Sequence, residues 1–183
     1  MDYFMSDTHF FDTKIIMLAN RPYDDIEIMH NDIIEKWNNK VDINDTVYFL
    51  GDVANFRDNQ YGSKDNRMEL IKNIIIRLNG VKVLIMGNHD DWATKEEWLN
   101  MGFDTVIEYP IVYQEFIILS HSPLFINETT PFVNLFGHVH NNPIYKDFSY
   151  HHFCVCVERI NYTPISFNEI KQIISNNKDT KEN

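Results

Sequence analysis

Five short segments of the chain carry side chains that bind metal ions, and most of them follow a run of hydrophobic residues. The segments are Ser6-Asp7-Thr8-His9, Gly51-Asp52, Gly87-Asn88-His89-Asp90, Ser120-His121 and Gly137-His138-Val139-His140. Their carboxylate, amide and imidazole groups suit Mn, Fe, Ni, Zn or Mg better than a structural thiolate zinc site, because no cysteine is among them. Such ligands, delivered from successive strand ends, can build a two-metal hydrolytic centre. We therefore expect the five segments to meet in the folded chain.

Each segment alone has an ordinary explanation. An Asp-x-His triplet is frequent by chance, Gly51-Asp52 fits a simple turn after a strand, and a lone His121 fits a structural histidine. His138 and His140 could be surface residues of a loop. The ordered set is harder to explain without a metal centre, because it collects most of the eight histidines at strand ends.

The spacing within the segments suits shared coordination. Asp7 and His9 are separated by one residue, so both side chains project from one side of an extended segment, and His138 and His140 do the same. The carboxylate of Asp52 has two oxygen atoms that can bridge two cations. Asn88 and His89 follow the strand that ends before Gly87. Asn88 offers a neutral oxygen ligand, and His89 stands beside the site.

The elements that must position these segments can be predicted from hydrophobic periodicity. Strands are expected at residues 3–5, 46–50, 81–86, 106–107, 111–112, 116–119, 133–136 and 153–157. Helices are expected at residues 13–18, 24–38, 68–78, 94–101 and 166–174, with a polar loop at 55–66. Helices alternate with strands in the first half and strands dominate the second, which favours α/β layers with a mixed sheet or two packed sheets.

Composition narrows the function classes. The chain has 183 residues, and we expect a single domain over residues 1–175 with a polar tail at 176–183. A net charge of -11 disfavours sequence-independent binding of nucleic acid or of an anionic membrane, but it leaves room for a small phosphorylated substrate beside bound cations. No apolar run is long enough to span a membrane, and no leader peptide is evident. Cys154 and Cys156 are expected to be buried or half-buried free thiols, which suits a cytoplasmic location.

Residues outside the five segments could contact a substrate. Arg21 follows the first ligand pair, and a guanidinium group matches phosphate oxygens, so we predict that it binds substrate; a surface salt bridge is the alternative. Asn55, Arg57 and Tyr61 follow Asp52 in a loop and could line the pocket.

The other polar candidates have simpler interpretations. His151-His152 is expected to be an exposed loop or a strand edge, and His30 is expected on the surface of a helix. Asn141 and Asn142 could contact substrate, although a turn explains them equally well.

The ordered motifs resemble those of a known family. Asp7-x-His9, Gly51-Asp52, Gly87-Asn88-His89-Asp90, His121 and Gly137-His138-x-His140 are similar to the complete motif set of the calcineurin-like metallophosphoesterases. Phe10-Phe11-Asp12 and Asn20-Arg21-Pro22-Tyr23 resemble small bacterial and bacteriophage members. The resemblance spans residues 7–140.

This resemblance implies a fold and a set of roles. The fold would be a four-layer α/β/β/α sandwich, in which two mixed β-sheets pack face to face with helices outside. One cation, most often Mn, would be held by Asp7, His9, Asp52 and His140, and the second by Asp52, Asn88, His121 and His138. Asp52 would bridge the two cations. His89 would be the general acid or the partner of the transition state, oriented by a carboxylate such as Asp90 or Asp52, and Asn88 would also lie against the substrate.

The implied activity is the hydrolysis of a phosphate ester. A hydroxide that bridges the two cations would attack the phosphorus of a phosphodiester or phosphomonoester of a nucleotide or small metabolite. The branch of protein phosphatases carries Asp-Arg-Gly after its Gly-Asp, whereas this chain has Val53-Ala54-Asn55-Phe56-Arg57, which disfavours a protein substrate. Two alternatives stay open: a binding scaffold of the same fold without catalysis, and a nuclease acting on nucleic-acid ends.

Overall fold

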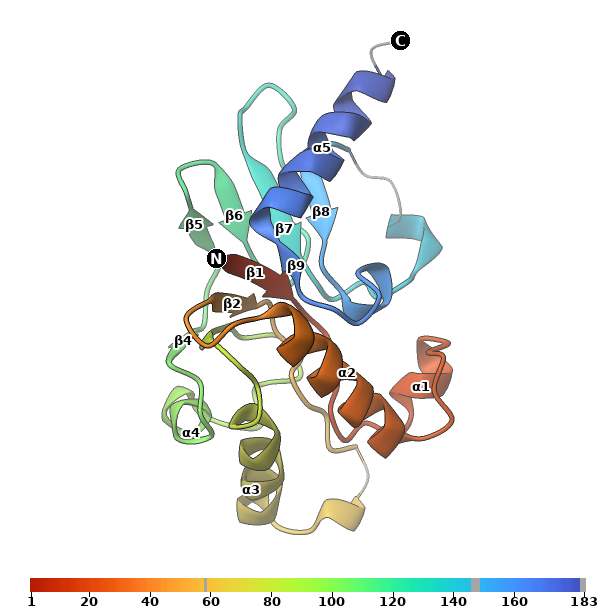
Figure 1. The fold of residues 1–183 in the computed structure, drawn as a ribbon, viewed down its shortest axis with the longest axis vertical. Coiled ribbons are helices and arrows are strands. Elements are labelled where there is room, and N and C mark those ends of the chain that lie inside the picture. Colours follow the sequence, from red (N-terminus) through yellow and green to blue (C-terminus); the bar gives the residue numbers. More distant parts are fainter. Residues whose placement is uncertain (58, 146–148, 182–183) are drawn as a thin grey trace.

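Two β-sheets form the centre of the molecule (Figure 1). The structure, a computed structural model, describes residues 1–57, 59–145 and 149–181. The strand order is β4-β3-β2-β1-β9 in the five-stranded sheet and β5-β6-β7-β8 in the four-stranded sheet. Both sheets contain parallel and antiparallel pairs, so the predicted α/β class with two mixed sheets is confirmed.

The five-stranded sheet contains the first strands of the chain. Its members are β1 (Asp2–Met5), β2 (Thr46–Phe49), β3 (Val81–Ile85), β4 (Thr105–Ile107) and β9 (Ile165–Ser166). Strands β1 to β4 are parallel, and β9 pairs antiparallel to β1. The pattern of the sequence does not predict β9, because two residues are too few to show alternation.

The four-stranded sheet comes from the second half of the chain. Its members are β5 (Ile111–Tyr113), β6 (Ile117–Leu119), β7 (Val133–Phe136) and β8 (His152–Cys154). Strands β6, β7 and β8 are parallel, whereas β5 runs antiparallel to β6. Isolated bridge pairing between Ser6 and Cys156 joins the chain beyond β1 to the chain beyond β8, so the two sheets approach each other at their carboxyl ends.

Five α-helices accompany the sheets in the described part of the chain. They are α1 (Ile15–Leu18), α2 (Ile26–Lys40), α3 (Lys64–Ile75), α4 (Lys95–Asn100) and α5 (Phe167–Lys181), with short 3-10 helices at Asn59–Tyr61, Pro143–Tyr145 and Val157–Arg159. The predicted capping box of α4 is present, with Thr94 and Glu97 bonded reciprocally. Helix α3 begins earlier than predicted because Ser63 caps it, and α5 continues past the predicted end at residue 174.

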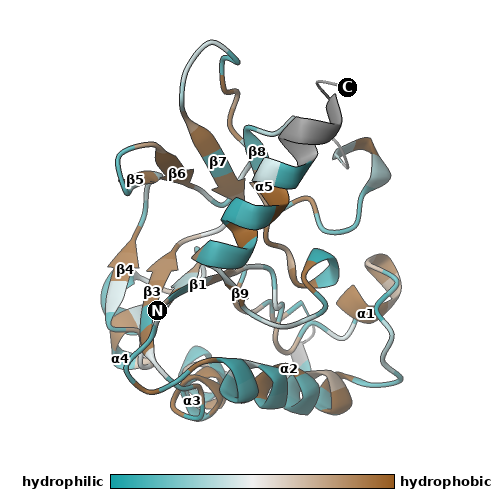
Figure 2. Ribbon diagram, turned by 45° about the horizontal axis from the view of Figure 1, so that its top comes forward, coloured by the Kyte–Doolittle hydropathy of each residue, from teal (hydrophilic) through white to brown (hydrophobic). Residues whose placement is uncertain are grey.

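Alternation along the strands separates two hydrophobic cores. In β1, Tyr3 and Met5 point into the core shared with helices α1 to α4, while Phe4 points into the core shared with the four-stranded sheet. Helices α2, α3 and α4 lie on one side of the five-stranded sheet, and the four-stranded sheet lies on the other (Figure 1). The strands β3, β4 and β7 are mostly hydrophobic, and α2 is mostly hydrophilic, as expected for its outer face (Figure 2). Helix α5 inserts Ile170 into the core between the sheets.

Two histidines are buried, against the predictions made from the sequence. His30 is buried, because its ring accepts the backbone N–H of Phe11 over 3.0 Å and packs against Phe10. His151 is also buried, with its Nδ1 atom 2.7 Å from the backbone oxygen of Phe132, whereas His152 begins the edge strand β8, as the prediction of a strand edge allowed. Periodicity could not show either outcome, because each partner comes from a distant segment. The two cysteines are free thiols, as predicted, and no helix in the described ranges has the length and hydrophobicity to span a bilayer.

Candidate metal centre

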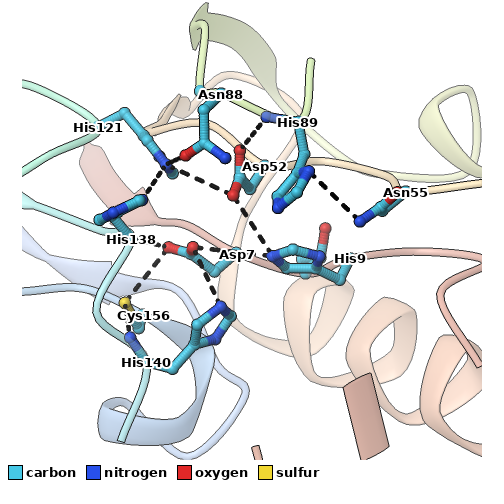
Figure 3. A network of polar contacts seen from close by, with 12 residues as sticks. Asp7, His9, Asp52, Asn55, Asn88, His89, His121, His138, His140 and Cys156 are labelled. Carbon is cyan, nitrogen blue, oxygen red and sulfur yellow. Dashed lines mark hydrogen bonds and ion pairs between the residues drawn. The ribbon is translucent and has the colours of Figure 1, made fainter. Parts of the chain in front are cut away.

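The five predicted segments meet at the carboxyl ends of parallel strands (Figure 3). Asp7 and His9 follow β1, Asp52 follows β2, Asn88 follows β3, His121 follows β6, and His138 and His140 follow β7. Parallel strands place their carboxyl ends at one edge of a sheet, and the close approach of the two sheets brings both edges together. The structure therefore gathers every predicted metal ligand in one place.

The ligand atoms form two neighbouring groups. The donor atoms of Asp7, His9 and His140 lie within 4.8 Å of one another, and so do those of Asp52, His121 and His138. We call these sets the Asp7 group and the Asp52 group. Asn88 belongs with the second, because its Oδ1 atom is 3.0 Å from Nε2 of His121.

A single oxygen atom joins the two groups. Oδ2 of Asp52 is 3.5 Å from Nε2 of His9 and 3.4 Å from Nε2 of His121. The other oxygen, Oδ1, accepts the backbone N–H of His89 over 2.8 Å. Oδ2 is thus the oxygen that faces both groups, in the position of a bridging ligand.

The chemistry of the donor set fits divalent cations. Oδ1 of Asp7 and Nε2 of His9 are buried and have no hydrogen-bond partner within the protein. Buried polar atoms without partners are rare because they lose their solvation without compensation. Cations coordinated by these oxygen and imidazole atoms would satisfy them.

The backbone at the site is unusual. Asp7, His9, Asp52, His138 and His140 all have positive φ, between 49° and 71°. This left-handed conformation is uncommon for residues other than glycine, and it costs about 1–3 kcal/mol at each position. Strain concentrated on five residues that share one cluster indicates that their side-chain directions matter more than local stability.

Glycines allow the segments to approach closely. A Cβ atom on Gly137 would lie 2.4 Å from Oδ2 of Asp7, and one on Gly87 would lie 2.3 Å from Oδ1 of Asp52. Neither distance is compatible with van der Waals contact. The glycines that precede the ligands in the sequence are therefore required by space, a signal that was visible before the structure.

The charges of the cluster support one another. Burial lowers the pKa of His9, but the nearby carboxylates of Asp12 and Asp52 outweigh it and raise the pKa to about 9. Burial also lowers the pKa of His121, and the nearby Asp52 carboxylate raises it to about 9. Burial raises the pKa of Asp52, yet the two imidazoles hold it well below its usual range. In the metal-free protein, the positive charges of protonated His9 and His121 offset the negative charge of the Asp52 carboxylate. A bound cation would take over that role.

Hydrogen-bonded partners orient two of the histidines, and a third has a carboxylate nearby. Nδ1 of His121 lies 2.8 Å from the backbone oxygen of Leu50, and Nδ1 of His140 lies 2.9 Å from the Glu158 carboxylate. Nδ1 of His9 lies 3.6 Å from the carboxylate of Asp12, which is beyond hydrogen-bond distance. Partners on Nδ1 hold a ring so that Nε2 faces the other donor atoms of its group.

Sequence reasoning missed two of these outer partners, Asp12 and Glu158. Asp12 carried a weak signal, because it stands three residues after His9, but it was noticed only as part of a motif. Glu158 carried none, since it lies far from His140 along the chain and reaches it only through the fold.

His89 is placed beside the two groups. Its ring packs near His9, with centroids 5.3 Å apart, and Nδ1 lies 3.4 Å from Nδ2 of Asn55. The expectation that Asp90 orients this ring is wrong: the Asp90 carboxylate accepts backbone N–H groups of Asp52, Val53 and Gly87 instead. Asp90 therefore shapes the loop that carries Asp52 rather than the imidazole of His89.

A pocket of about 820 Å³ opens over the cluster. Its lining includes four histidines: His9, His89, His138 and His140. Among the described residues that line the pocket, Arg57 is the sole arginine or lysine. The Nε atom of Arg57 is anchored 3.1 Å from the carboxylate of Asp12. The prediction that Arg57 lines the pocket is therefore confirmed, whereas Asn55 is not among the residues that line it. Asn141 and Asn142, directly after His140, also line the pocket, and their contact with a substrate stays a prediction.

Arg21 lies elsewhere, and the structure contradicts its predicted contact with substrate. Its guanidinium group donates to the Glu158 carboxylate and to the backbone oxygens of Asp7 and Thr8. The side chain has no exposed surface, so it cannot reach a ligand in the pocket. The predicted alternative, a salt bridge, is correct, but the bridge is buried. Tyr61 also differs from its prediction, since it packs between Phe11 and Phe56.

Known proteins with similar structures have the same fold. A protein of unknown function from Aquifex aeolicus superposes with a TM-score of 0.65 and is 28% identical, covering 94% of this chain and 98% of that one. Nuclease MPE from Pseudomonas putida superposes with a TM-score of 0.50 over 76% of this chain and 60% of the nuclease. At 19% identity, this second likeness shows the fold alone.

Sequence comparisons identify the family. An uncharacterized protein of Methanocaldococcus jannaschii is 31% identical over 96% of this chain and 92% of its own length. The family model described as calcineurin-like phosphoesterase matches residues 3–173, which include both ligand groups and the pocket. The chain therefore belongs to the calcineurin-like phosphoesterase family.

Proposed function

We propose that this protein is a two-metal-dependent phosphohydrolase that cleaves a phosphodiester or phosphomonoester of a nucleotide or small metabolite. The observation that carries the proposal is the position of Asp52, whose Oδ2 atom faces His9 of one ligand group and His121 of the other. A carboxylate oxygen shared between two sets of ligands is the arrangement that a binuclear centre requires.

The proposal assigns the ligands as follows. One cation is held by Asp7, His9, Asp52 and His140, and the other by Asp52, Asn88, His121 and His138. When bound, the two cations would activate a water molecule and neutralise the charge of the phosphoryl oxygens. Mn²⁺ is our first choice, with Fe, Ni, Zn and Mg as alternatives, because the donors are mixed oxygen and nitrogen atoms.

The protein's own residues would bind and orient the ester. His89 borders the pocket next to His9 and is placed to hydrogen-bond the phosphoryl group or the leaving oxygen. Asn88, whose amide oxygen lies 3.0 Å from Nε2 of His121, is also proposed to contact the ester. Arg57, anchored by Asp12, supplies the positive charge that Arg21 cannot supply.

The substrate is proposed to be small. The chain carries a net charge of -11, which opposes long-range attraction of a polyanion. Two free thiols suit a reducing compartment such as the cytoplasm. Nuclease activity on nucleic-acid ends is the second candidate function. The specific reason to test this activity is the fold that this chain shares with nuclease MPE.

The test is a screen of metals against substrates. Metal-free protein is supplied with Mn²⁺, Ni²⁺, Mg²⁺ or Zn²⁺ and assayed on bis(p-nitrophenyl) phosphate, p-nitrophenyl phosphate, cyclic nucleotides and single-stranded DNA. We expect turnover of at least one small ester that chelators abolish. Preferential cleavage of DNA would support the nuclease, and no turnover with any metal would support a scaffold.

Matched variants make the screen specific. Asp52→Asn keeps the shape of the bridging side chain but removes its charge, and it should abolish turnover. Asp91→Asn is the control, because Asp91 is an exposed carboxylate close by in sequence. Activity that survives in Asp52→Asn, or that ignores chelators, would rule out the two-metal mechanism.

A further inference from the structure

Arg21 and Glu158 form a buried ion pair directly behind the Asp7 group. Nε and Nη2 of Arg21 donate to Oε1 of Glu158 over 2.9 and 2.7 Å. The side chain of Arg21 has no exposed surface, and that of Glu158 is 4% exposed. Neither side chain lines the pocket, so the pair cannot act on a substrate directly.

The pair nevertheless contacts two of the three ligands of that group. The carboxylate of Glu158 lies 2.9 Å from Nδ1 of His140. On the other side, Nη2 of Arg21 donates to the backbone oxygen of Asp7 and Nη1 donates to that of Thr8, each over 2.7 Å. One ion pair therefore connects the loop after β1 to the loop after β7.

We propose that Arg21 and Glu158 are positioning residues that set the affinity of the Asp7 group for its cation and leave the Asp52 group largely unaffected. This inference rests on the proposed function, because it assumes that both groups bind metal. It replaces the predicted role of Arg21 as a substrate ligand with a role behind the site.

The contact with Glu158 selects the tautomer of His140. A carboxylate accepts but does not donate, so Nδ1 of His140 must carry the proton, and the lone pair of a neutral ring is then on Nε2. Nε2 is the atom that faces Oδ1 of Asp7, at 3.7 Å. A carboxylate behind a histidine ligand also makes the ring a stronger donor to a metal.

The contacts of Arg21 hold the strained backbone of Asp7. Asp7 has a φ of 61°, and its Oδ1 atom is one of the buried atoms that have no partner in the protein. Two charge-assisted hydrogen bonds to consecutive backbone oxygens oppose relaxation of this loop. Without them, we expect the carboxylate of Asp7 to leave its place beside His140.

Stability alone is a poor explanation for the pair. A buried ion pair recovers its desolvation cost only with excellent geometry, and hydrophobic residues of similar size are often as stable. Here the hydrogen bonds of Arg21 and Glu158 converge on metal ligands. The Asp52 group has different supports, since His121 is oriented by the backbone oxygen of Leu50 and the loop of Asp52 by Asp90.

The experiment titrates metal-free protein with Zn²⁺ and follows the imidazole ¹⁵N signals of His140 and His121, one reporter for each group. In Glu158→Gln we expect the affinity reported by His140 to fall about 10–100-fold, as is typical when an outer partner of a ligand is lost. The affinity reported by His121 should stay within about twofold of wild type. Glu169→Gln, which breaks the partly exposed pair with Lys40 far from the ligand groups, is the matched control.

A second variant guards against misfolding, because Glu158→Gln leaves a buried arginine unpaired. Arg21→Met combined with Glu158→Gln removes both charges, and it should show the same selective loss while keeping a cooperative thermal unfolding transition. In wild type, the spectra should show the proton on Nδ1 of His140.

Three results would overturn the inference alone. They are affinities unchanged from wild type at both reporters in folded variants, equal losses of affinity at both reporters, and a proton on Nε2 of His140 in the metal-free neutral ring. If wild type binds no Zn²⁺ at either reporter, the proposed function fails, and the inference fails with it. If wild type binds at both reporters and the variants match it, only the inference fails.

Discussion

The backbone N–H of His89 donates a hydrogen bond to Oδ1 of Asp52 over 2.8 Å. This bond ties the loop after β3 to the loop after β2, and it turns the other carboxylate oxygen toward His9 and His121. This contact thus joins His89, which is proposed to transfer a proton, to Asp52, which is proposed to bridge the cations. That contact depends on the backbone of His89 and not on its ring, so the two roles can be separated by mutation.

Replacement of the His89 ring should reduce turnover without loss of metal. In His89→Gln the backbone bond to Asp52 persists, so the cations should bind as in wild type. Loss of a general acid typically lowers the rate by about 10²–10⁴. The measurement compares kcat on bis(p-nitrophenyl) phosphate with the metal content by atomic emission. A variant that loses its metals, or one with unchanged kcat, would contradict this separation of roles.

The strand ends could be predicted from the sequence, because each ligand directly follows a short hydrophobic run. Asp52 after β2 and His138 after β7 are examples. Glycine before a ligand was a second local signal, and the close approach of Gly137 to Asp7 gives its physical reason. Local signals of this kind were sufficient to find the residues that meet in the site.

Features that depend on distant segments could not be predicted. Arg21 was predicted to bind phosphate because it follows the first ligand pair and a guanidinium group matches phosphate oxygens, yet its charge is satisfied by Glu158, which is remote in the sequence. His30 looked like a surface residue because helical periodicity cannot show that the backbone of Phe11 needs an acceptor. Strand β9 was missed because its pairing with β1 leaves no pattern in two residues.

The metal-free protein should lose stability as the pH rises above about 6.5. The pKa values of His9 and His121 are both raised to about 9 in the folded chain, above the ordinary histidine value of 6.5. A histidine whose pKa is raised by folding stabilises the fold fully at pH values below its pKa in the unfolded chain. This contribution is lost as the pH rises through its pKa in the folded chain. Urea unfolding in the presence of a chelator at pH 6 and pH 9 should therefore give a lower midpoint at pH 9.

The affinity for metal should change in the opposite direction. A cation must displace the protons of His9 and His121, so binding should release protons and should strengthen between pH 7 and pH 9. Calorimetry with Mn²⁺ in buffers of different ionisation enthalpy measures this release. Binding that releases no protons at pH 7 would show that these histidines are not ligands.

Acid should destabilise the protein through His30. Burial lowers the pKa of His30 to about 4, from an ordinary value of 6.5. A histidine whose pKa is lowered by folding leaves stability intact at pH values above its pKa in the unfolded chain. About 3 kcal/mol of the free energy of unfolding is then lost as the pH falls from 6.5 to 4. His30→Gln keeps an acceptor for the backbone N–H of Phe11 but does not titrate. Its unfolding free energy should therefore vary less than that of wild type over this pH range.

A methyl group at Gly137 should damage the site from behind. The added Cβ would lie 2.4 Å from both Oδ2 of Asp7 and Oγ of Ser6, so Gly137→Ala must displace both side chains or shift its own backbone. Overpacking of this kind costs about 1–3 kcal/mol of stability, and a displaced Asp7 should weaken metal binding as well. Thermal unfolding and Zn²⁺ titration measure the two effects. Wild-type values in both measurements would show that the loop is more adaptable than its contacts indicate.

Arg57 should govern the binding of substrate. Its Nε atom is held by the Asp12 carboxylate, and its side chain borders the pocket beside His9 and His89. A hydrogen bond from a charged donor contributes about 1.5–3 kcal/mol, so Arg57→Gln should raise KM by about 10–100-fold while kcat changes little. Arg77→Gln is the control, since Arg77 is exposed in the turn that follows α3 and does not line the pocket. If Arg57→Gln instead lowers kcat and leaves KM unchanged, the guanidinium group acts on the transition state alone, and the assignment of Arg57 to ground-state binding is wrong.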